Sequence, residues 1–265
     1  MTRDLDSQND VDVLLPIYYS QERFLIKSIN SLISQTLRPK IICILNGMDC
    51  KYNRYYEELL HDLKVDKILI SPKKGIPNAL NYAVQFCEAN YIARQDDDDI
   101  SHPERILKQK ELITKKNIDV LGCNINLINE YGQTVGARKY PLTDKECKLT
   151  LAYKTCFCHP SVMFKKSFLL KNKYPIVSGE DYALWLKSYE NSIFSNIDNQ
   201  LYYYRIHSRQ ISKTNINYLF FQESKKVIKK LEKKRERYFA AFNLILIIIN
   251  CLVKKRKIDF KTHLT

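Results

Sequence analysis

Residues 11–45 read VDVLLPIYYSQERFLIKSINSLISQTLRPKIICIL, two apolar runs joined by a segment with helical periodicity. Val11–Ile17 and Lys40–Leu45 are short and apolar almost throughout, which is typical of strands buried on both faces. Between them, Glu22–Leu37 carries apolar residues at intervals of three and four, which predicts a helix with one buried face. A strand, a helix and a second strand in this order favour parallel pairing.

The same alternation continues to about residue 95. The sequence predicts a helix at Tyr52–Leu63, a strand at Val65–Ile70, a helix at Pro77–Cys87 and a strand at Tyr91–Arg94. Such strands pair in parallel through right-handed crossovers, so we expect an open α/β sheet flanked by helices. The remaining predicted elements are a helix at Pro103–Lys116, a hairpin of Val120–Ile128 and Thr134–Arg138 around a turn at 129–132, a strand at Ser161–Phe164, a helix at Asp181–Tyr189 and a strand at Gln200–Arg205.

The composition excludes a wholly disordered or fibrous protein, because 45% of the 265 residues are hydrophobic and 27% are charged. The net charge of +14 is unevenly distributed, since residues 213–265 hold fourteen basic and four acidic residues. We therefore divide the chain into a balanced domain at 1–212 and a basic segment at 213–265. The positive charge surrounds an apolar block without a recognition motif, so we expect no binding of nucleic acid.

Eight cysteines occur without a CxxC pair or the spacing of a disulfide framework, which favours buried thiols in a reducing cytosol. The run Cys156-Phe157-Cys158-His159 lacks the second pair of ligands that a zinc site needs. The first ten residues are polar and acidic, so we expect no secretory signal. These features predict a cytoplasmic protein.

Four consecutive aspartates, Asp96–Asp99, directly follow the predicted strand Tyr91–Arg94. In an open α/β sheet, ligands bind beyond the carboxyl ends of the strands, and these aspartates stand at such an end. Adjacent carboxylates repel one another unless a cation offsets the repulsion, and oxygen ligands suit Mg²⁺ or Mn²⁺. The run alone leaves a second interpretation open, in which it is a solvated turn and Asp99 caps the following helix.

A second acidic pair, Glu180-Asp181, stands at the start of a predicted helix. Either carboxylate is a candidate general base, and either is also suited to stabilise the N-terminus of the helix. Arg205 and His207 come at the end of the balanced region and offer cationic donors suited to a diphosphate. His159 is more typical of a core or loop histidine than of a catalytic one.

Taken together and in this order, these pieces resemble the inverting family-two nucleotide-sugar glycosyltransferases of the GT-A fold, which is a Rossmann-like open mixed sheet flanked by helices. The resemblance covers residues 11–212. The segments that carry it are VLLPIYY at 13–19, SINSLISQT at 28–36, YIARQDDDDISHPER at 91–105, HPSVMF at 159–164, EDY at 180–182 with Trp185, and YRIH at 204–207.

The resemblance implies roles for the acidic residues. Asp96 and Asp98 match the two acids of the family's DXD motif. Asp98 is expected to ligate Mn²⁺ or Mg²⁺, and Asp96 to face the nucleoside and metal-bound water. Asp181 matches the catalytic base, with Glu180 as its neighbour and substitute.

It also implies the surroundings of the donor. His207 and Arg205 are expected near the diphosphate, His207 as a further metal ligand, while Pro16 and Tyr18 line the nucleotide pocket. Many relatives carry Asp-Asp-Gly-Ser after the second strand, where an aspartate contacts the base. This chain has Asn46-Gly47 there, and the Asn46 side chain can still donate to and accept from a base edge. The identity of the nucleotide therefore stays open.

The implied activity is metal-dependent, inverting transfer of one sugar from a nucleotide-diphosphate sugar, expected to be a UDP-sugar, to a hydroxyl of a saccharide acceptor. We expect a lipid-linked acceptor and a place in cell-surface polysaccharide biosynthesis (O-antigen, capsule or lipooligosaccharide). The Gln-x-x-Arg-Trp pattern of processive synthases is absent, which favours addition of a single sugar. The alternative is a metal-dependent nucleotidyltransferase or phosphohydrolase, which also uses clustered aspartates.

The basic segment contains an apolar stretch, Tyr238–Val253, with basic clusters on both sides. Its sixteen residues fall short of the ~20 that a helix needs to cross a bilayer. The basic flanks favour a helix that lies on the inner face of the cytoplasmic membrane. A helix packed on the catalytic domain or on a second copy, and a true membrane span, are the alternatives.

Overall fold

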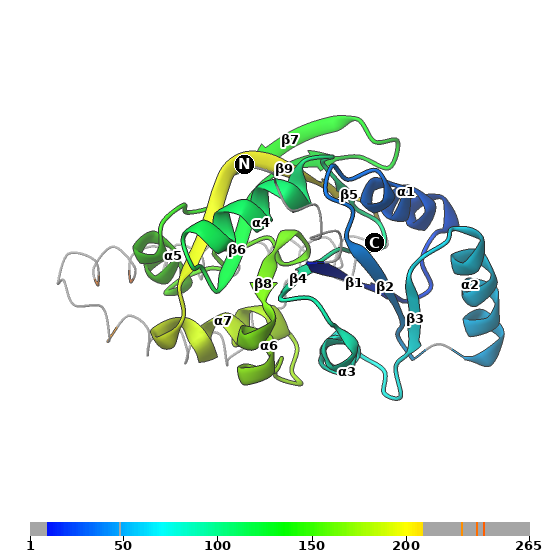
Figure 1. The fold of residues 1–265 in the computed structure, drawn as a ribbon. Helices are drawn as coiled ribbons and strands as arrows, with labels where there is room; N and C mark the ends of the chain where they lie inside the picture. The colour runs from blue at the N-terminus through cyan, green and yellow to red at the C-terminus, as the bar shows by residue number, and fades with distance from the viewer. Residues whose placement is uncertain (1–9, 48, 209–228, 230–236, 238–240, 242–265) are drawn as a thin grey trace, which may run out of the picture.

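The computed structural model describes residues 10–47 and 49–208, together with the isolated residues 229, 237 and 241. The described residues form one nine-stranded mixed sheet with helices on both faces (Figure 1). In sheet order the strands are β3 (Lys67–Ile70), β2 (Lys40–Leu45), β1 (Val11–Ile17), β4 (Tyr91–Arg94), β8 (Met163–Lys165), β6 (Val120–Ile128), β9 (Phe194–Arg205) and β5 (Ile100–Ser101), and β7 (Thr134–Arg138) pairs with β6.

The first four strands pair in parallel, as predicted. The helices between them are α1 (Glu22–Ile33), α2 (Cys50–Asp62) and α3 (Ile76–Ala83). β1 is apolar on both faces because it separates two cores. Val13 and Leu15 pack in the core that includes α1, whereas Leu14 packs in the core that includes α3. Six described cysteines are free and buried, as expected.

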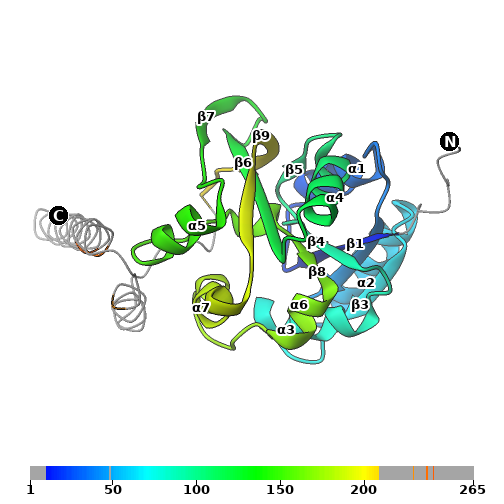
Figure 2. The same cartoon turned by 60° about the vertical axis from the view of Figure 1, so that its left-hand side comes forward.

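β8 runs antiparallel to β4 and β6 and so joins the parallel half of the sheet to the rest. β6 and β7 form the predicted hairpin, and β9 pairs in parallel with β6. The remaining helices are α4 (Arg105–Lys115), α5 (Asp144–Leu151), α6 (Lys166–Lys171) and α7 (Glu180–Ser188). Figure 2 shows the β6–β7 hairpin at one end of the molecule and the helices α6 and α7 at the opposite end.

Three predicted strands have different bounds in the structure. β3 begins at Lys67 rather than Val65. β8 begins two residues later than predicted, because His159–Ser161 form a 3₁₀ turn. β9 begins at Phe194 rather than Gln200. Its centre, residues 198–200, is exposed and polar, and the pairing register with β6 shifts at this point. Because of this polar interruption, the first half of the strand does not continue the apolar pattern from which the strand was predicted.

The order of the strands reverses at β1, which has β2 on one side and β4 on the other. Ligands of open α/β sheets bind beyond the carboxyl ends of the strands at such a reversal. The residues that follow β1, β2 and β4 include Tyr18, Asn46 and the run Asp96–Asp99. The topology therefore gathers the predicted donor-binding residues at one edge.

The basic segment at 213–265, with its predicted helix at Tyr238–Val253, lies outside the described residues. No helix among the described residues is both long and apolar enough to cross a membrane.

Candidate active site

The turn that carries the four aspartates, Asp96–Asp99, follows β4 and is held by buried polar side chains. We call it the acid turn. The Gln95 amide group donates to Ser28 Oγ at 3.0 Å and to the Asp99 carbonyl oxygen at 3.1 Å. The Gln95 side-chain oxygen accepts from Ser101 Oγ and from Arg105 Nη1, both at 2.8 Å. These bonds fix the backbone on both sides of the aspartates, so the carboxylates are presented on an ordered turn.

Three of the aspartates form a candidate cation site. Asp96, Asp98 and Asp99 bring carboxylate oxygens within 4.8 Å of one another. Burial raises the pKa of Asp98 and of Asp99, and the neighbouring carboxylates raise both further. An all-oxygen donor set under mutual repulsion fits a divalent cation such as Mg²⁺ or Mn²⁺. The structure therefore brings together the two acids of the predicted DXD motif, Asp96 and Asp98.

Asp99 does not cap the following helix, so that interpretation is wrong. α4 begins at Arg105, and the residue before it is Glu104. Asp99 is fully buried rather than solvated, and its Oδ1 accepts a hydrogen bond from the backbone N–H of Arg205 at 2.7 Å. Its carboxylate joins the acid turn to the end of β9.

Asp97, the middle residue of the DXD motif, points toward the end of β1. Its Oδ2 accepts from the backbone N–H of Tyr18 at 3.5 Å. Burial raises the pKa of Asp97 well above the usual carboxyl value, and Asp98 and Asp96 add to the shift. No function was predicted for Asp97, because the middle position of the DXD motif can hold any residue type. The structure shows that it ties the acid turn to the first strand.

Arg94 is a buried cation beside the acid turn, and sequence analysis gave it no separate role. It is 3% exposed, and its Nη1 donates to Asp96 Oδ1 at 2.6 Å. Burial lowers the pKa of the Arg94 guanidinium, but Asp96 together with Tyr174 and Tyr202 outweighs this effect, so the pKa is raised. Arg94 therefore stays charged and holds Asp96 in one orientation.

Glu180 and Asp181 occupy the first turn of α7, directly after Gly179. The φ angle of Gly179 is 76°, in the left-handed region that glycine enters readily. Burial raises the pKa of both carboxyls; Arg94 opposes this shift and Asp96 adds to it. The charges of Arg94 and Asp96, which pair with each other at the turn that carries the aspartates, therefore also act on the second acidic pair.

His159 lies in the core, as expected for a histidine of this type. It is 8% exposed, and its Nε2 lies 2.9 Å from the Tyr174 hydroxyl oxygen. Burial lowers the pKa of His159 well below the usual value, and the Arg94 charge lowers it further. The imidazole is therefore neutral and supports the wall between β4 and α7.

Arg205 was predicted to lie near the diphosphate, and in the structure its side chain contacts the backbone of the turn that carries the aspartates. Its side chain is buried beneath this turn. Arg205 Nε donates to the Asp98 carbonyl oxygen at 2.7 Å, and Nη1 donates to the Asn129 carbonyl oxygen at 3.0 Å. The guanidinium also lies over the Phe24 ring at 4.4 Å from its centroid. Arg205 thus positions the acid turn by binding its backbone and that of the β6–β7 turn.

His207 lies beside the predicted metal ligand. Its Nε2 is 2.8 Å from Asp98 Oδ2, and its side chain is 9% exposed. The ring packs against Phe24 with 5.6 Å between the centroids. The imidazole and the Asp98 carboxylate are close enough to hold one cation between them.

The ends of β1 and β2 meet the loop before α3. Asn46 Oδ1 accepts from the Gly75 N–H at 2.9 Å, so the side chain offers its NH₂ group as the donor that remains. Lys74 Nζ lies 4.7 Å from the centroid of the Tyr18 ring. Pro16 is buried within β1, two residues before Tyr18, and its place in the nucleotide pocket stays a prediction. Lys74 and Gly75 were not predicted to lie here, although a glycine just before a predicted helix was an available signal.

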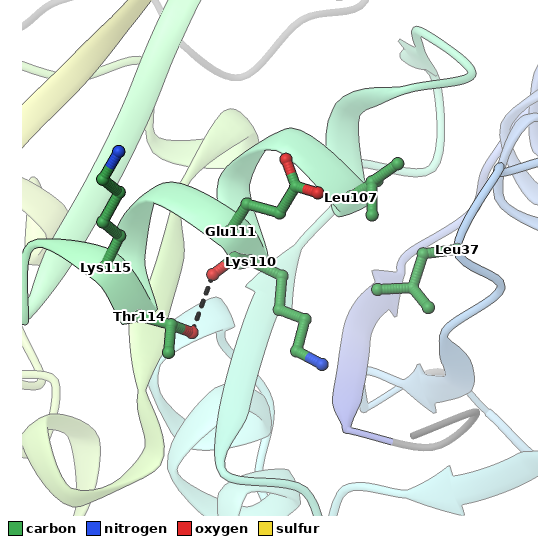
Figure 3. A pocket seen from close by; sticks show the side chains of 6 residues that line it. All are labelled: Leu37, Leu107, Lys110, Glu111, Thr114 and Lys115. Carbon is green, nitrogen blue, oxygen red and sulfur yellow. Dashed lines mark hydrogen bonds between the residues drawn. The ribbon is translucent and has the colours of Figure 1, made fainter. Parts of the chain in front are cut away.

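A surface groove of about 390 Å³ lies along α4 (Figure 3). Its lining side chains are Leu37, Leu107, Lys110, Glu111, Thr114 and Lys115. A second groove of about 260 Å³ lies on the same helix and extends to Ile197 and Asn199. Neither groove is lined by a predicted site residue, so the acid turn lies elsewhere on the described surface.

Comparison with known proteins identifies relatives of the whole domain. The family model for glycosyl transferase family 2 matches residues 12–171. The chain is 34% identical over 218 residues to the O-antigen biosynthesis glycosyltransferase WbnJ of Escherichia coli, across 78% of this chain and 84% of that protein. It is 24% identical over 256 residues to the E. coli UDP-Glc:alpha-D-GlcNAc-diphosphoundecaprenol beta-1,3-glucosyltransferase WfgD, across 95% and 96% of the two chains.

Among solved structures, the fold is similar to that of S. aureus TarS 1-349 in complex with UDP-GlcNAc. The TM-score is 0.63 at 17% sequence identity, and the match covers 89% of this chain and 70% of that chain. The mixed sheet and its flanking helices are thus those of the GT-A fold. The chain therefore belongs to glycosyl transferase family 2 and is a glycosyltransferase.

Proposed function

We propose that this protein is a metal-dependent, inverting glycosyltransferase. It moves one sugar from a UDP-sugar to a hydroxyl group of a lipid-linked saccharide in the biosynthesis of a cell-surface polysaccharide. One observation carries the proposal: Asp96 clusters with Asp98, and the charge of the same Asp96 carboxylate raises the pKa of Glu180 and of Asp181. The first group suits a cation with a diphosphate, and the second suits a proton acceptor.

In this proposal Asp98 and Asp96 hold Mn²⁺ or Mg²⁺, with His207 as a further ligand. A bound divalent cation neutralises the negative charge that develops on the departing nucleoside diphosphate. Arg94 keeps Asp96 in place, and Arg205 keeps the backbone of the turn in place. The nucleotide lies at the ends of β1 and β2, where Tyr18 offers an aromatic face and the Asn46 NH₂ group donates to a carbonyl oxygen of the base.

Asp181 is the proposed general base, with Glu180 as its substitute. Asp181 takes the proton from the acceptor hydroxyl while that oxygen attacks the anomeric carbon from the face opposite the diphosphate. The new carbon–oxygen bond forms as the bond to the diphosphate breaks, so the configuration inverts. The pKa of Asp181 is raised, mainly by burial, and this makes its carboxylate a stronger base than one in water.

The names of the relatives support the choice of substrates. WfgD is named for UDP-Glc and for a sugar on diphosphoundecaprenol, and the TarS structure contains UDP-GlcNAc. We extend both features to this chain, as a UDP-sugar donor and a lipid-linked acceptor. Residues 1–212 are the proposed catalytic domain, and the basic segment at 213–265 holds it at the inner face of the membrane.

Thermal unfolding of the 265-residue chain with a panel of nucleotide sugars, with and without Mn²⁺ or Mg²⁺, tests the donor and the cation. We expect one UDP-sugar to raise the melting temperature only when the metal is present, and a chelator to reverse the effect. With an acceptor added, the released product should be UDP. Release of pyrophosphate would instead indicate a nucleotidyltransferase, and protection by no nucleotide sugar would contradict the proposal.

A further inference from the structure

Three exposed apolar side chains lie in one short segment that leads to the proposed base. Leu170, Ile176 and Val177 are 53%, 65% and 40% exposed. Glu180, the first residue of α7, follows Val177 after only two residues. Single apolar residues are common on protein surfaces, but three within residues 170–177, beside a candidate catalytic group, indicate a contact surface. We call these residues the 170–177 segment.

A buried tyrosine, Tyr174, anchors the centre of the 170–177 segment, and the apolar side chains on either side of it stay exposed at the surface. Tyr174 is 4% exposed, and its N–H donates to Asn81 Oδ1 at 2.9 Å. The Tyr174 carbonyl oxygen accepts from Asn81 Nδ2 at 2.9 Å, and the hydroxyl oxygen lies 2.9 Å from His159 Nε2. With Tyr174 fixed in the core, Ile176 and Val177 are held at the surface by the backbone itself.

The charge of this region is positive. Residues 165–177 contain four lysines and no acidic residue. Lys165 pairs with Asp119 at 2.9 Å, whereas Lys171 and Lys173 are exposed. Exposed lysines beside apolar side chains are complementary to an anionic bilayer, because the lysines meet the phosphates while the apolar groups enter the interface.

We propose that the 170–177 segment docks on an anionic phospholipid bilayer and holds the Glu180-Asp181 pair at the membrane surface. This inference rests on the proposed transfer to a lipid-linked acceptor, whose sugar stays close to the bilayer. The contact is distinct from the one proposed for residues 213–265. Two separate contacts fix the orientation of a protein on a membrane, whereas one contact leaves it free to rotate.

Tryptophan fluorescence can detect membrane contact of the 170–177 segment separately from membrane contact elsewhere in the chain. The chain has one tryptophan, Trp185, which is fully buried, so an Ile176→Trp variant supplies a distinct signal. The matched control is Ile70→Trp, because Ile70 is 46% exposed at the end of β3. Both are mixed with phosphatidylglycerol–phosphatidylcholine vesicles that carry brominated acyl chains. We expect the emission of the first variant to shift to the blue and to be quenched by the brominated chains, and that of the control to stay unchanged.

A double variant, Ile176→Asp with Val177→Asp, measures the strength of the contact. It should bind anionic vesicles about tenfold more weakly than Ile70→Asp. It should also lose activity on a lipid-linked acceptor while keeping activity on a soluble short-chain analogue.

Co-sedimentation with vesicles without quenching at position 176 would overturn the inference, because the contact would then lie elsewhere. A blue shift at position 176 that grows with protein concentration without lipid would also overturn it, in favour of a second copy of the chain. Quenching at position 176 without transfer of any sugar would support the membrane contact and contradict the proposed function.

Discussion

Replacement of Arg205 by methionine tests whether a buried cation holds the acid turn. The change removes hydrogen bonds to the carbonyl oxygens of Asp98 and Asn129, at 2.7 and 3.0 Å, and keeps most of the bulk that packs on Phe24. A hydrogen bond from a charged group contributes about 1.5–3 kcal/mol. Removal of one partner from a buried charged network costs about 3–5 kcal/mol. We therefore expect the free energy of unfolding to fall by about 3–5 kcal/mol.

Arg23 offers a matched control for this measurement. Its guanidinium also lies over Phe24, at 4.6 Å from the ring centroid, and it reaches the same hairpin through Glu130 at 3.4 Å. The Arg23 side chain is 55% exposed, so solvent screens the pair and Arg23→Met should cost less than about 1 kcal/mol. Urea unfolding followed by circular dichroism compares the two variants. Equal losses would contradict the buried role of Arg205.

Donor binding separates this positioning role from direct contact with a diphosphate. Arg205→Lys keeps a positive charge but not the planar fork that spans two carbonyl oxygens. We expect it to lower stability and metal-dependent donor binding together, because both depend on the same turn. Normal stability with lost donor affinity in calorimetry would place Arg205 against the diphosphate after all.

The remaining predictions concern the acids and one glycine. Asp181→Asn should keep donor binding in calorimetry and lower kcat by roughly 10²–10⁴, measured as UDP release, and near-normal turnover would remove Asp181 from the role of base. Asp98→Ala should abolish metal-dependent donor binding, and an unchanged affinity would count against the metal site. Burial raises the pKa of Asp181, so the acid limb of a kcat–pH profile should lie above the usual carboxyl range. The same raised pKa stabilises the fold at low pH, and this stability is lost as the pH rises through the folded value, so urea unfolding of Asp181→Asn should depend less on pH. Gly47→Ala should lower the melting temperature more than Gly132→Ala, because both glycines have positive φ but only at Gly47 does a Cβ approach another residue, Lys74 Cα at 2.7 Å.

The parallel half of the fold could be predicted because each of its strands is a short, mainly apolar segment. Lys40–Leu45 is one example, and its bounds are those predicted. β5 has only two residues, Ile100–Ser101, and exists because it pairs with Tyr202 and Tyr203 far along the chain. No local pattern signals such a strand. α5 was missed although Thr143 and Glu146 form a capping box, since its apolar face is short.

The acidic residues of the candidate site could be predicted from the sequence, but the buried arginines that hold them in place could not. Asp96 and Asp98 stand in a motif whose spacing can be read directly. The burial of Arg94 and Arg205 depends on tertiary packing, and an arginine in a sequence is more often exposed. The contacts of Arg205 with the carbonyl oxygens of Asp98 and Asn129 could therefore not be predicted from the sequence.

The acid turn is held by hydrogen bonds to residues that are synthesised much later than the aspartates themselves. Arg205 and His207 contact Asp99 and Asp98 across sequence separations of 106 and 109 residues. During translation the four aspartates leave the ribosome before β9 does. A nascent chain therefore carries the whole acidic motif without the residues at the end of β9 that hold it in place. A ribosome-stalled or proteolysed fragment that stops before β9 would therefore retain the recognisable signature and lack the assembled site.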